Sequence, residues 1–299
     1  MITEQQKIAV VTGASSGIGY GIAQGLVLSG FHVIITGRNE SAGVEAISRL
    51  RHEAQTGTVD FVQADSSKKI DMEQLALHIQ ERLGRLDVLV NNAGYVTGVR
   101  QVSNDGLEMN LAVNHLMPLY LTYLLFPLLQ QSSDARVVNL LTQNHRFVKR
   151  KWLDDMNSEQ YFQGMDAYGK TKLYNLLCLY RISVEQEHVK MFAADPGGND
   201  TALMKTAMAS VPPQMKIGMA IVRPFFSRVL AKKTLADGAK SGIQAAISQE
   251  YRTKAGLYLN EKAMIEQSSK RSYDKFLQDK VWRASQEMLG IDFSQVLHK

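Results

Sequence analysis

Thr12-Gly13-Ala14-Ser15-Ser16-Gly17-Ile18-Gly19 stands directly after a short apolar segment, residues 7–12, and at the start of a helical pattern. Glycines between a strand and a helix let the chain turn tightly and approach a pyrophosphate held at the helix N-terminus. No Lys-Ser or Lys-Thr pair closes the motif, which excludes a P-loop. The sequence therefore predicts a dinucleotide site, against the alternative of a simple glycine-rich turn. Its predicted contacts are Gly13, Ser15, Ser16, Gly17, Ile18 and Gly19.

Short β-branched runs alternate with longer helical stretches along the rest of the chain, a rhythm typical of a parallel sheet. Strands are expected at 7–12, 32–36, 58–64, 86–91, 136–141, 189–195 and 256–260. Helices are expected from 17, 40 and 68, over 105–130 and 166–187, up to 250, and over 266–289. This order predicts an α/β fold, a doubly wound Rossmann sheet of about seven mostly parallel strands with helices on both faces. Residues 1–299 are expected to form one catalytic domain, with a Met-rich substrate lid at about 197–234.

Composition excludes several classes of protein. The 299 residues are 45% hydrophobic and 21% charged, with a net charge of +5 that is dispersed along the chain. The one basic cluster, Lys149-Arg150-Lys151, is too short for a nucleic-acid surface, so no nucleic acid is expected. The single Cys178 fits a reducing compartment, and no metal is expected. The N-terminus has no signal or anchor pattern, and the apolar run 116–129 is short for a membrane span, so a cytoplasmic protein is predicted.

The end of the second strand indicates which cofactor binds. An acidic residue about 20 residues beyond the glycines would accept hydrogen bonds from a ribose 2′-hydroxyl, but Ile35-Thr36-Gly37-Arg38 offers none. Arg38 instead has a permanently charged planar group that suits a 2′-phosphate. The sequence therefore favours NADP(H) over NAD(H), with a surface arginine in a turn as the alternative.

Tyr168 and Lys172 lie one turn apart on a predicted helix and share a face. A neighbouring ammonium favours a phenolate, so we expect Lys172 to lower the pKa of Tyr168 from about 10 and to make the phenol a general acid and base. Tyr258 and Lys262 have the same spacing. Tyr258 lies in a predicted strand with no oxyanion-binding hydroxyl before it, which favours the first pair.

The glycine motif, Asn91-Asn92-Ala93-Gly94 and Tyr168-x-x-x-Lys172 occur in the order found in the short-chain dehydrogenase/reductase family, which the chain resembles over nearly its whole length. The resemblance implies that Asp65 contacts the adenine ring and that Asn114 holds a proton-relay water near the lysine. It also implies that the loop Pro196-Gly197-x-x-x-Thr201 closes on the nicotinamide. The further cofactor contacts that it implies are Asn92, Ala93, Gly94, Tyr168, Lys172, Pro196, Gly197 and Thr201.

More narrowly, three features resemble the retinol-dehydrogenase-like branch of that family. They are Arg136-Val-Val-Asn139, an insert with Trp152, Asp154 and Tyr161, and Lys280-Val-Trp282-x-x-Ser285. Microsomal members of the branch carry an N-terminal membrane anchor, and this sequence shows no such pattern.

Two positions depart from the family pattern. Thr142 stands where the family has a serine that holds the substrate oxygen; it keeps a hydroxyl, and its alternative is a strand-end threonine in a site with impaired turnover. Asp195 precedes Pro196 and has no explanation from sequence. His145 either lines the substrate pocket or lies on its rim.

The sequence thus predicts an NADP(H)-dependent oxidoreductase that reduces a hydrophobic ketone or aldehyde, reversibly, with Asn114, Thr142, Tyr168 and Lys172 as the catalytic residues. The alternative is a non-catalytic NADP(H)-binding sensor or partner-binding protein on the same fold. The substrate can be a retinoid or another apolar carbonyl compound. The sequence leaves open a weak contact with a membrane surface and a choice between monomer and homodimer.

Overall fold

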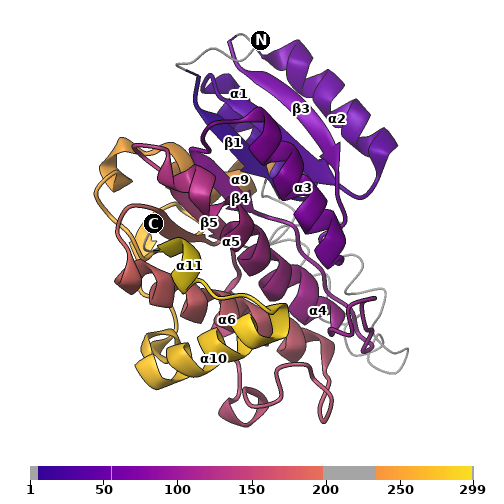
Figure 1. Ribbon diagram of the computed structural model, residues 1–299, viewed down its shortest axis with the longest axis vertical. Coiled ribbons are helices and arrows are strands. Elements are labelled where there is room, and N and C mark those ends of the chain that lie inside the picture. The colour runs from indigo at the N-terminus through magenta and orange to yellow at the C-terminus, as the bar shows by residue number, and fades with distance from the viewer. Residues whose placement is uncertain (1–5, 55, 198–233, 298–299) are drawn as a thin grey trace.

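The computed structural model describes residues 6–54, 56–197 and 234–297 (Figure 1). Thr201 and all but the ends of the expected lid, 197–234, lie outside the described residues. Figure 1 shows one sheet with helices on both of its faces.

The sheet has eight strands in the order β3-β2-β1-β4-β5-β6-β7-β8. Neighbours pair in parallel from β3 to β7, and only β8 runs antiparallel, to β7. The reversal of strand order beside β1 creates a crevice at the carboxyl ends of β1 and β4, the usual ligand position in such sheets. The strands are β1 Ile8–Val11, β2 His32–Gly37, β3 Thr58–Gln63, β4 Val88–Asn91, β5 Arg136–Leu140, β6 Lys190–Ala194, β7 Leu257–Leu259 and β8 Ile265–Glu266.

The central strands divide their side chains between two hydrophobic cores. On β1, Ile8 and Val10 belong to one core, and Ala9 and Val11 belong to the other. Because neither face of β1, β2, β4 and β5 meets water, these strands read as nearly continuous apolar runs. Helices α1 Gly17–Leu28, α2 Glu40–Glu53 and α9 Leu235–Ile247 cover one face. Helices α3 Lys69–Arg82, α5 Met117–Gln130 and α6 Gly164–Glu185 cover the other.

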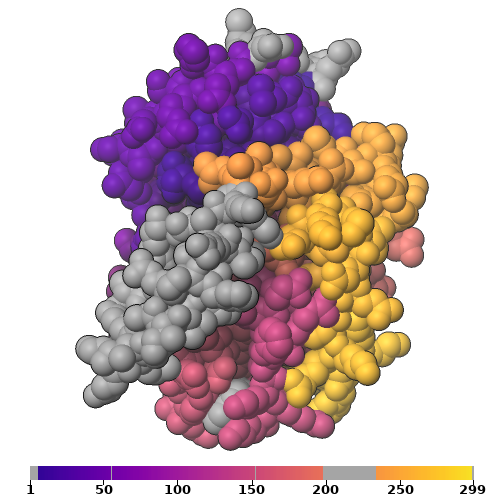
Figure 2. All heavy atoms as spheres, turned by 180° about the vertical axis from the view of Figure 1, so that it is seen from behind, coloured from indigo at the N-terminus to yellow at the C-terminus, as the bar shows by residue number. Residues whose placement is uncertain are grey.

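Helix α9 brings a late part of the chain against the first helix. Two glycines of α1 make this approach close: a Cβ on Gly21 would lie 3.1 Å from the Cβ of Ala239, and one on Gly25 would lie 2.5 Å from Ile243 Cδ1. Figure 2 shows this arrangement from behind, with the chain after residue 234 in orange against the indigo N-terminal part.

The long helix expected over 105–130 is interrupted. It begins with α4 Met109–Leu111, continues as a π-helical turn, η1 Ala112–Leu116, and then becomes α5. The expected start at 105 was wrong, because Glu108 caps α4 by accepting hydrogen bonds from the backbone N–H groups of Asn110 and Leu111. Met109–Gln130 is long and apolar enough to cross a membrane by composition, but 78% of its most apolar window is buried within the fold, as in a core helix.

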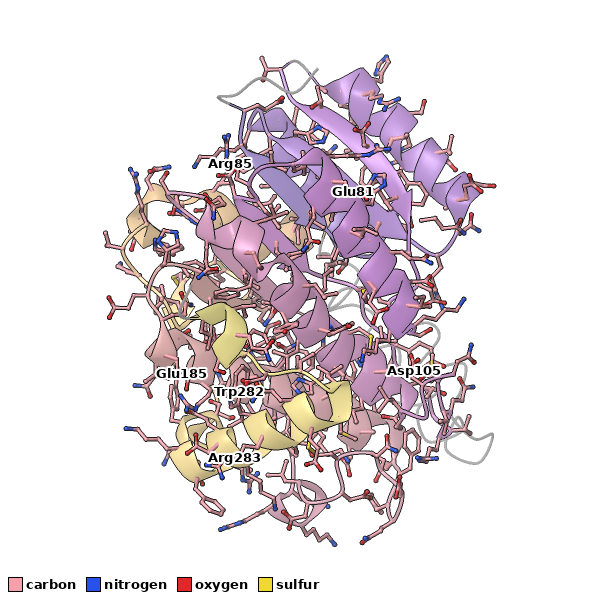
Figure 3. All side chains as sticks on the ribbon, viewed as in Figure 1. Glu81, Arg85, Asp105, Glu185, Trp282 and Arg283 are labelled. Atoms are coloured by element: carbon pink, nitrogen blue, oxygen red, sulfur yellow. The ribbon has the colours of Figure 1, made fainter. Side chains whose placement is uncertain are left out.

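The C-terminal part packs outside α5 and α6. After the short 3-10 turns η4 Gln249–Tyr251 and η5 Lys270–Tyr273, it forms α10 Lys275–Leu289 and α11 Ser294–Leu297. The C-terminal helix thus begins later than the expected position near 266, because Asp274 caps its first turn by accepting from the N–H of Leu277. In Figure 3, Trp282 lies between α10 and the neighbouring helices, and it is buried, whereas the next residue, Arg283, is exposed.

Candidate active site

A cavity of about 370 Å³ opens at the carboxyl ends of the central strands. It brings together segments that follow β1, β2, β3, β4, β5 and β6, with two side chains from α6. Of the residues predicted to contact a cofactor, it is lined by Gly13, Ser15, Ser16, Gly17, Ile18, Gly19, Arg38, Asp65, Asn92, Ala93, Gly94, Tyr168, Lys172 and Pro196. The predicted residues Asn114, Thr142 and Gly197 are described but do not line it.

The glycine loop after β1 is fastened to the loop after β4. Asn92 Nδ2 donates to the carbonyl oxygens of Thr12 at 2.8 Å and Gly13 at 3.0 Å, and Thr12 Oγ1 accepts from the N–H groups of Asn92 and Ala93. Gly13 has a φ of +62°, and a Cβ there would lie 2.9 Å from Ala93 Cα. The turn therefore requires glycine and leaves the backbone open to the cavity.

The N-terminus of α1 faces this cavity with N–H donors that its cap residue does not satisfy. Ser16 is the cap residue, but its side chain makes no capping hydrogen bond, and the first turn contains no acidic residue. The first N–H groups of a helix need acceptors and carry a partial positive charge. An uncapped helix end beside a glycine turn fits the pyrophosphate of a nicotinamide dinucleotide.

Arg38 lies at the end of β2 with its side chain exposed at the cavity, and it makes no ion pair among residues 6–54, 56–197 and 234–297. Ser15 lies beside the same strand end, since a Cβ on Gly37 would be 3.1 Å from Ser15 Oγ. Asp65, after β3, also lines the cavity, and its carboxylate accepts from the N–H and the hydroxyl of Ser67.

Asn114 sits in the π-helical turn and clamps the loop after β4. Its Oδ1 accepts from Tyr95 N at 2.9 Å, and its Nδ2 donates to Tyr95 O at 2.7 Å. Its backbone carbonyl accepts from Asn175 Nδ2 at 2.9 Å. The direct contacts of Asn114 therefore position Tyr95 in the cavity wall, and the water-holding role that the resemblance implied stays a prediction.

Tyr168 and Lys172 lie on one face of α6, as predicted, and the hydrogen bond of the ammonium goes to the backbone of β5. Lys172 Nζ lies 5.7 Å from the centre of the Tyr168 ring and donates to Leu140 O at 2.8 Å. Burial raises the pKa of Tyr168 above its ordinary value, and the Asp195 carboxylate raises it further. Burial also lowers the pKa of Lys172 to about 8. The expectation that Lys172 lowers the pKa of Tyr168 was wrong for this structure, and Tyr168 is held in its protonated form.

Comparison with known proteins agrees with this geometry. Residues 7–150 match the sequence profile described as short chain dehydrogenase. Polyprenol dehydrogenase of Danio rerio is 33% identical over 293 residues, which cover 95% of this chain and 87% of that protein. A short-chain dehydrogenase/reductase of Colletotrichum higginsianum is 31% identical over 308 residues, covering 92% and 73%. The chain belongs to the short-chain dehydrogenase/reductase family.

Further relatives support the retinol-dehydrogenase-like branch of the family. Retinol dehydrogenase 14 of Homo sapiens is 30% identical over 302 residues, which cover 95% of this chain and 87% of that protein. Among solved structures, an uncharacterised protein of Mycobacterium paratuberculosis superposes with a TM-score of 0.74 at 23% identity and covers 96% of this chain and 95% of its own. A short-chain dehydrogenase of Shigella flexneri, solved with NADP, has a TM-score of 0.63 at 24% identity, covering 86% and 97%. Both structures show the fold.

The sequence features of the branch meet in space on this short-chain dehydrogenase/reductase. Lys280 on α10 forms an ion pair with Asp154 of the insert, and Ser285 on α10 is 2.7 Å from His115 Nε2 in the π-helical turn. The helix α10 is therefore attached both to the insert and to the turn that presents Asn114.

Thr142 caps the turn η2 Gln143–Arg146 after β5. Its Oγ1 accepts from Asn144 N at 3.5 Å, which leaves the hydroxyl hydrogen for another acceptor. His145 is buried and is not among the residues that line the cavity of about 370 Å³, so its place relative to the substrate stays a prediction. The two ring nitrogens of His145 lie 2.6 Å from Thr142 O and 3.2 Å from Ser269 N, so the ring braces the backbone of Thr142.

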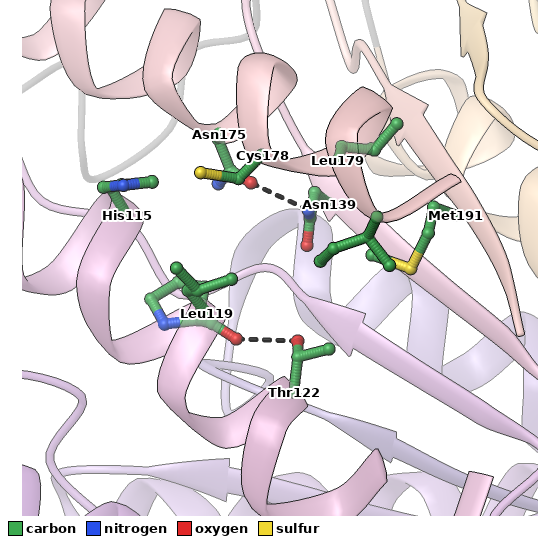
Figure 4. A pocket seen from close by; sticks show the side chains of 10 residues that line it. His115, Leu119, Thr122, Asn139, Asn175, Cys178, Leu179 and Met191 are labelled. Carbon is green, nitrogen blue, oxygen red and sulfur yellow. Dashed lines mark hydrogen bonds between the residues drawn. The ribbon is translucent and has the colours of Figure 1, made fainter. Parts of the chain in front are cut away.

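A second, separate cavity of about 10 Å³ lies between η1, α5 and α6 (Figure 4). His115, Asn139, Asn175 and Cys178 are among the residues that line it, and it is large enough for one water molecule. Asn139 Nδ2 donates to Asn175 Oδ1 at 2.7 Å, and Asn175 donates in turn to Asn114 O. This row of buried amides connects β5 to the site.

Sequence reasoning missed a network of polar residues next to Thr142 in the chain. Gln143 and Tyr258 both bond to Asp195, which the sequence marked as unusual without giving it a role. Tyr258 appeared only as the false partner of Lys262. The signal that could have found them is topological: Gln143 follows β5 and Asp195 follows β6, and parallel neighbours end at the same edge of a sheet.

Proposed function

We propose that this oxidoreductase uses NADP(H) to interconvert a hydrophobic aldehyde or ketone and its alcohol, and that reduction is its favoured direction. The observation that carries the proposal is the meeting of Tyr168 and Lys172 with Arg38 and the uncapped end of α1 in one cavity. A cytoplasmic location is also proposed, and the buried free thiol of Cys178 is consistent with it.

Arg38 supports the preference for NADP(H). Arg38 follows β2 and lines the cavity together with Ser15, at a position where a carboxylate would favour NAD(H), and its guanidinium suits a 2′-phosphate. The Shigella flexneri short-chain dehydrogenase, which shares the fold, was solved in complex with NADP.

The chemistry follows from the site residues. The bound cofactor supplies the hydride. Tyr168, which stays protonated, gives its phenol proton to the carbonyl oxygen, and Thr142 donates a hydrogen bond to the same oxygen as charge develops on it. Lys172, charged below a pH of about 8, fixes α6 to β5 through Leu140 O and keeps a positive charge in the cavity wall.

The relatives support an apolar substrate. Their names, polyprenol dehydrogenase and retinol dehydrogenase, designate alcohols with long hydrocarbon parts. The cavity wall near Tyr168 contains Val96, Val113 and Leu141, which give it an apolar side. All-trans-retinal is therefore a suitable first probe.

The test is turnover of all-trans-retinal with NADPH and with NADH, followed by chromatography of the retinol formed. We expect reduction with NADPH, its loss in Tyr168→Phe, and a roughly tenfold to hundredfold weaker binding of NADPH in Arg38→Asp, since charge-assisted hydrogen bonds contribute about 1.5–3 kcal/mol. Arg82→Asp makes the same charge change on exposed α3 and serves as the control.

Two outcomes would contradict the proposal. Equal affinity for NADH and NADPH would remove the role given to Arg38. Tight binding of NADPH without turnover of retinal or of other apolar aldehydes would favour a nucleotide-binding sensor instead.

A further inference from the structure

Asp195 directly follows β6 and has a carboxylate that is 1% exposed. Its Oδ2 accepts from Tyr258 OH at 2.8 Å and from Gln143 Nε2 at 2.7 Å, and its Oδ1 accepts from Gly197 N at 2.8 Å. Its backbone bonds to two further elements, through Leu259 O on β7 and the hydroxyl of Ser241 on α9. One carboxylate therefore connects the segments after β5 and β6 with β7.

Among residues 6–54, 56–197 and 234–297, the side chains and backbone groups that donate to the Asp195 carboxylate are neutral. No ion pair to Asp195 forms among the residues that the structure describes. The nearest cation in its network is Arg146, whose Nε donates to Gln143 Oε1 at 2.6 Å and whose Nη2 pairs with Glu266 at 2.7 Å. A buried charge without a counterion is unfavourable for folding, so its presence at a site requires a reason.

Asp195 is linked through Gln143 and Pro196 to the two groups that would act on the substrate, Thr142 and Tyr168. Gln143, fixed between Asp195 and Arg146, is the residue after Thr142. Pro196, the residue after Asp195, lines the cavity together with Tyr168. Burial raises the pKa of Tyr168, and the Asp195 carboxylate raises it further.

We propose that Asp195 is a positioning residue of the active site, which fixes the Thr142–Gln143 turn and maintains Tyr168 as a proton donor. The first effect acts through hydrogen bonds and the second through charge. The carboxylate makes the phenolate unfavourable, so Tyr168 reaches the carbonyl with its proton. This role of Asp195 depends on the proposed function in one respect, that the Tyr168 proton is transferred to a carbonyl substrate.

The other groups that face Asp195 do not replace its charge. On β7, burial and then Asp195 raise the pKa of Tyr258, which keeps that phenol a donor. In the turn η2, burial lowers the pKa of His145, which keeps that ring neutral. Arg146 and Glu266 pair with each other beyond Gln143. We therefore expect removal of the Asp195 charge to change the electrostatic potential at the Tyr168 phenol.

The first experiment measures ionisation of Tyr168 directly and needs no substrate. The protein is labelled with ¹³C at tyrosine Cζ, the Tyr168 signal is assigned with Tyr168→Phe, and its shift is followed with pH. Asp195→Asn keeps the acceptor for Gly197 N and removes the charge, so we expect a larger ionised share of Tyr168 than in the unaltered protein at the same alkaline pH. Glu266→Gln removes a nearby charge that does not act on Tyr168, and we expect no change there.

A further pair of variants separates charge from scaffolding. Gln143→Met removes one donor to Asp195 and leaves its charge, so the ionised share of Tyr168 should not rise, whereas turnover should fall because the turn at Thr142 loses its anchor. In the retinal assay, Asp195→Asn should move the alkaline loss of reduction to lower pH. If Asp195 had only a structural role, Asp195→Asn would lower kcat at every pH and would leave the pH at which activity falls on the alkaline side unchanged.

The outcomes distinguish the two proposals. Equal ionised shares in Asp195→Asn, Glu266→Gln and the unaltered protein, up to the pH of unfolding, would overturn the role of Asp195 whether or not retinal is reduced. Failure of the unaltered protein to reduce any apolar carbonyl, with the expected change in the Tyr168 titration, would overturn the proposed function alone.

Discussion

Lys172 carries an ammonium group in a buried position, where a charge is unfavourable for folding. Lys172 as a whole is 4% exposed, and its ammonium has one hydrogen-bond acceptor among the described residues, the Leu140 carbonyl. Burial lowers its pKa from 10.5 to about 8, so the folded state holds the charged form unfavourably. A residue kept in such a place is typical of a functional site, because packing alone would be served better by an apolar side chain.

We therefore expect Lys172→Met to abolish turnover and to stabilise the fold at pH 7. A depressed lysine pKa means that the unfolded chain binds more protons between pH 8 and 10.5, so the unaltered protein gains stability as pH rises through this window. After loss of the hydrogen bond to Leu140 is allowed for, Lys172→Met should raise the free energy of unfolding by about 1–3 kcal/mol at pH 7, and by less at pH 9.5. Urea unfolding at both values of pH measures this, and a destabilised variant at pH 7 would contradict it.

Thr142 is one of the two residues at which this chain departs from the family pattern, and substitutions there can remove its hydroxyl or its methyl group separately. Thr142→Ser keeps the donor, so we expect turnover of retinal at least equal to that of the unaltered protein. Thr142→Val keeps the shape and removes the donor, and we expect kcat to fall about a hundredfold or more, as for loss of one donor to a developing oxyanion. Steady-state kinetics decide whether the Thr142 hydroxyl takes part in catalysis. Equal rates for Thr142→Val and the unaltered protein would show that it does not.

The spacing of Tyr168 and Lys172 showed that the two side chains share a helix face, but it could not show where the ammonium points. Burial of the phenol, and then the carboxylate of Asp195 after β6, raise the pKa of Tyr168, while the Leu140 carbonyl accepts the hydrogen bond of the Lys172 ammonium. The local sequence therefore identified the pair, but it predicted a lowered pKa for Tyr168 where the structure raises it.

The regular elements were predictable because their signals are local. Apolar runs and turn residues placed β1 to β6 within one or two residues, and the start of α1 and α2 was placed correctly. The π-helical turn Ala112–Leu116 carries no such signal, since its residues suit an α-helix equally well. Strand β8 has only two residues and exists through its pairing with β7, so no periodicity could reveal it.

The loop between β1 and α1 packs closely against the loop after β4. Adding one methyl group at a glycine of this loop is a test of that packing. A Cβ at Gly19 would lie 2.7 Å from Gly13 O and 2.3 Å from Asn92 Nδ2, so the glycine loop and the loop after β4 would have to separate. We expect Gly19→Ala to weaken NADPH binding about tenfold or more, or about 1.4 kcal/mol, measured by calorimetric titration. Gly84→Ala, where a Cβ meets nothing within 4 Å, should bind as the unaltered protein does; similar losses in both variants would argue against this packing.

Across the whole molecule, stability depends on how the C-terminal part closes over α5 and α6. Phe293 is fully buried between α5 and α10, and its ring centre lies 4.8 Å from that of Trp282, 5.2 Å from that of Tyr123 and 6.3 Å from that of Phe126. Through α10 this cluster reaches Ser285 and His115, and so the turn that presents Asn114. The far end of the sequence thus supports the catalytic side of the fold without touching the cavity.

Phe293→Ala should accordingly lower the free energy of unfolding by about 3–5 kcal/mol, because the variant loses the buried ring and leaves a cavity that neighbouring rings cannot fill. Phe276→Ala makes the same change at the start of α10, where the ring is 77% exposed, and should stay within about 0.5 kcal/mol of the unaltered protein. Urea unfolding of the three proteins gives these differences. If α10 and α11 contribute nothing to the core, the two variants will have the same free energy of unfolding. If they complete the core, Phe293→Ala will also lose turnover with NADPH at temperatures at which Phe276→Ala stays active.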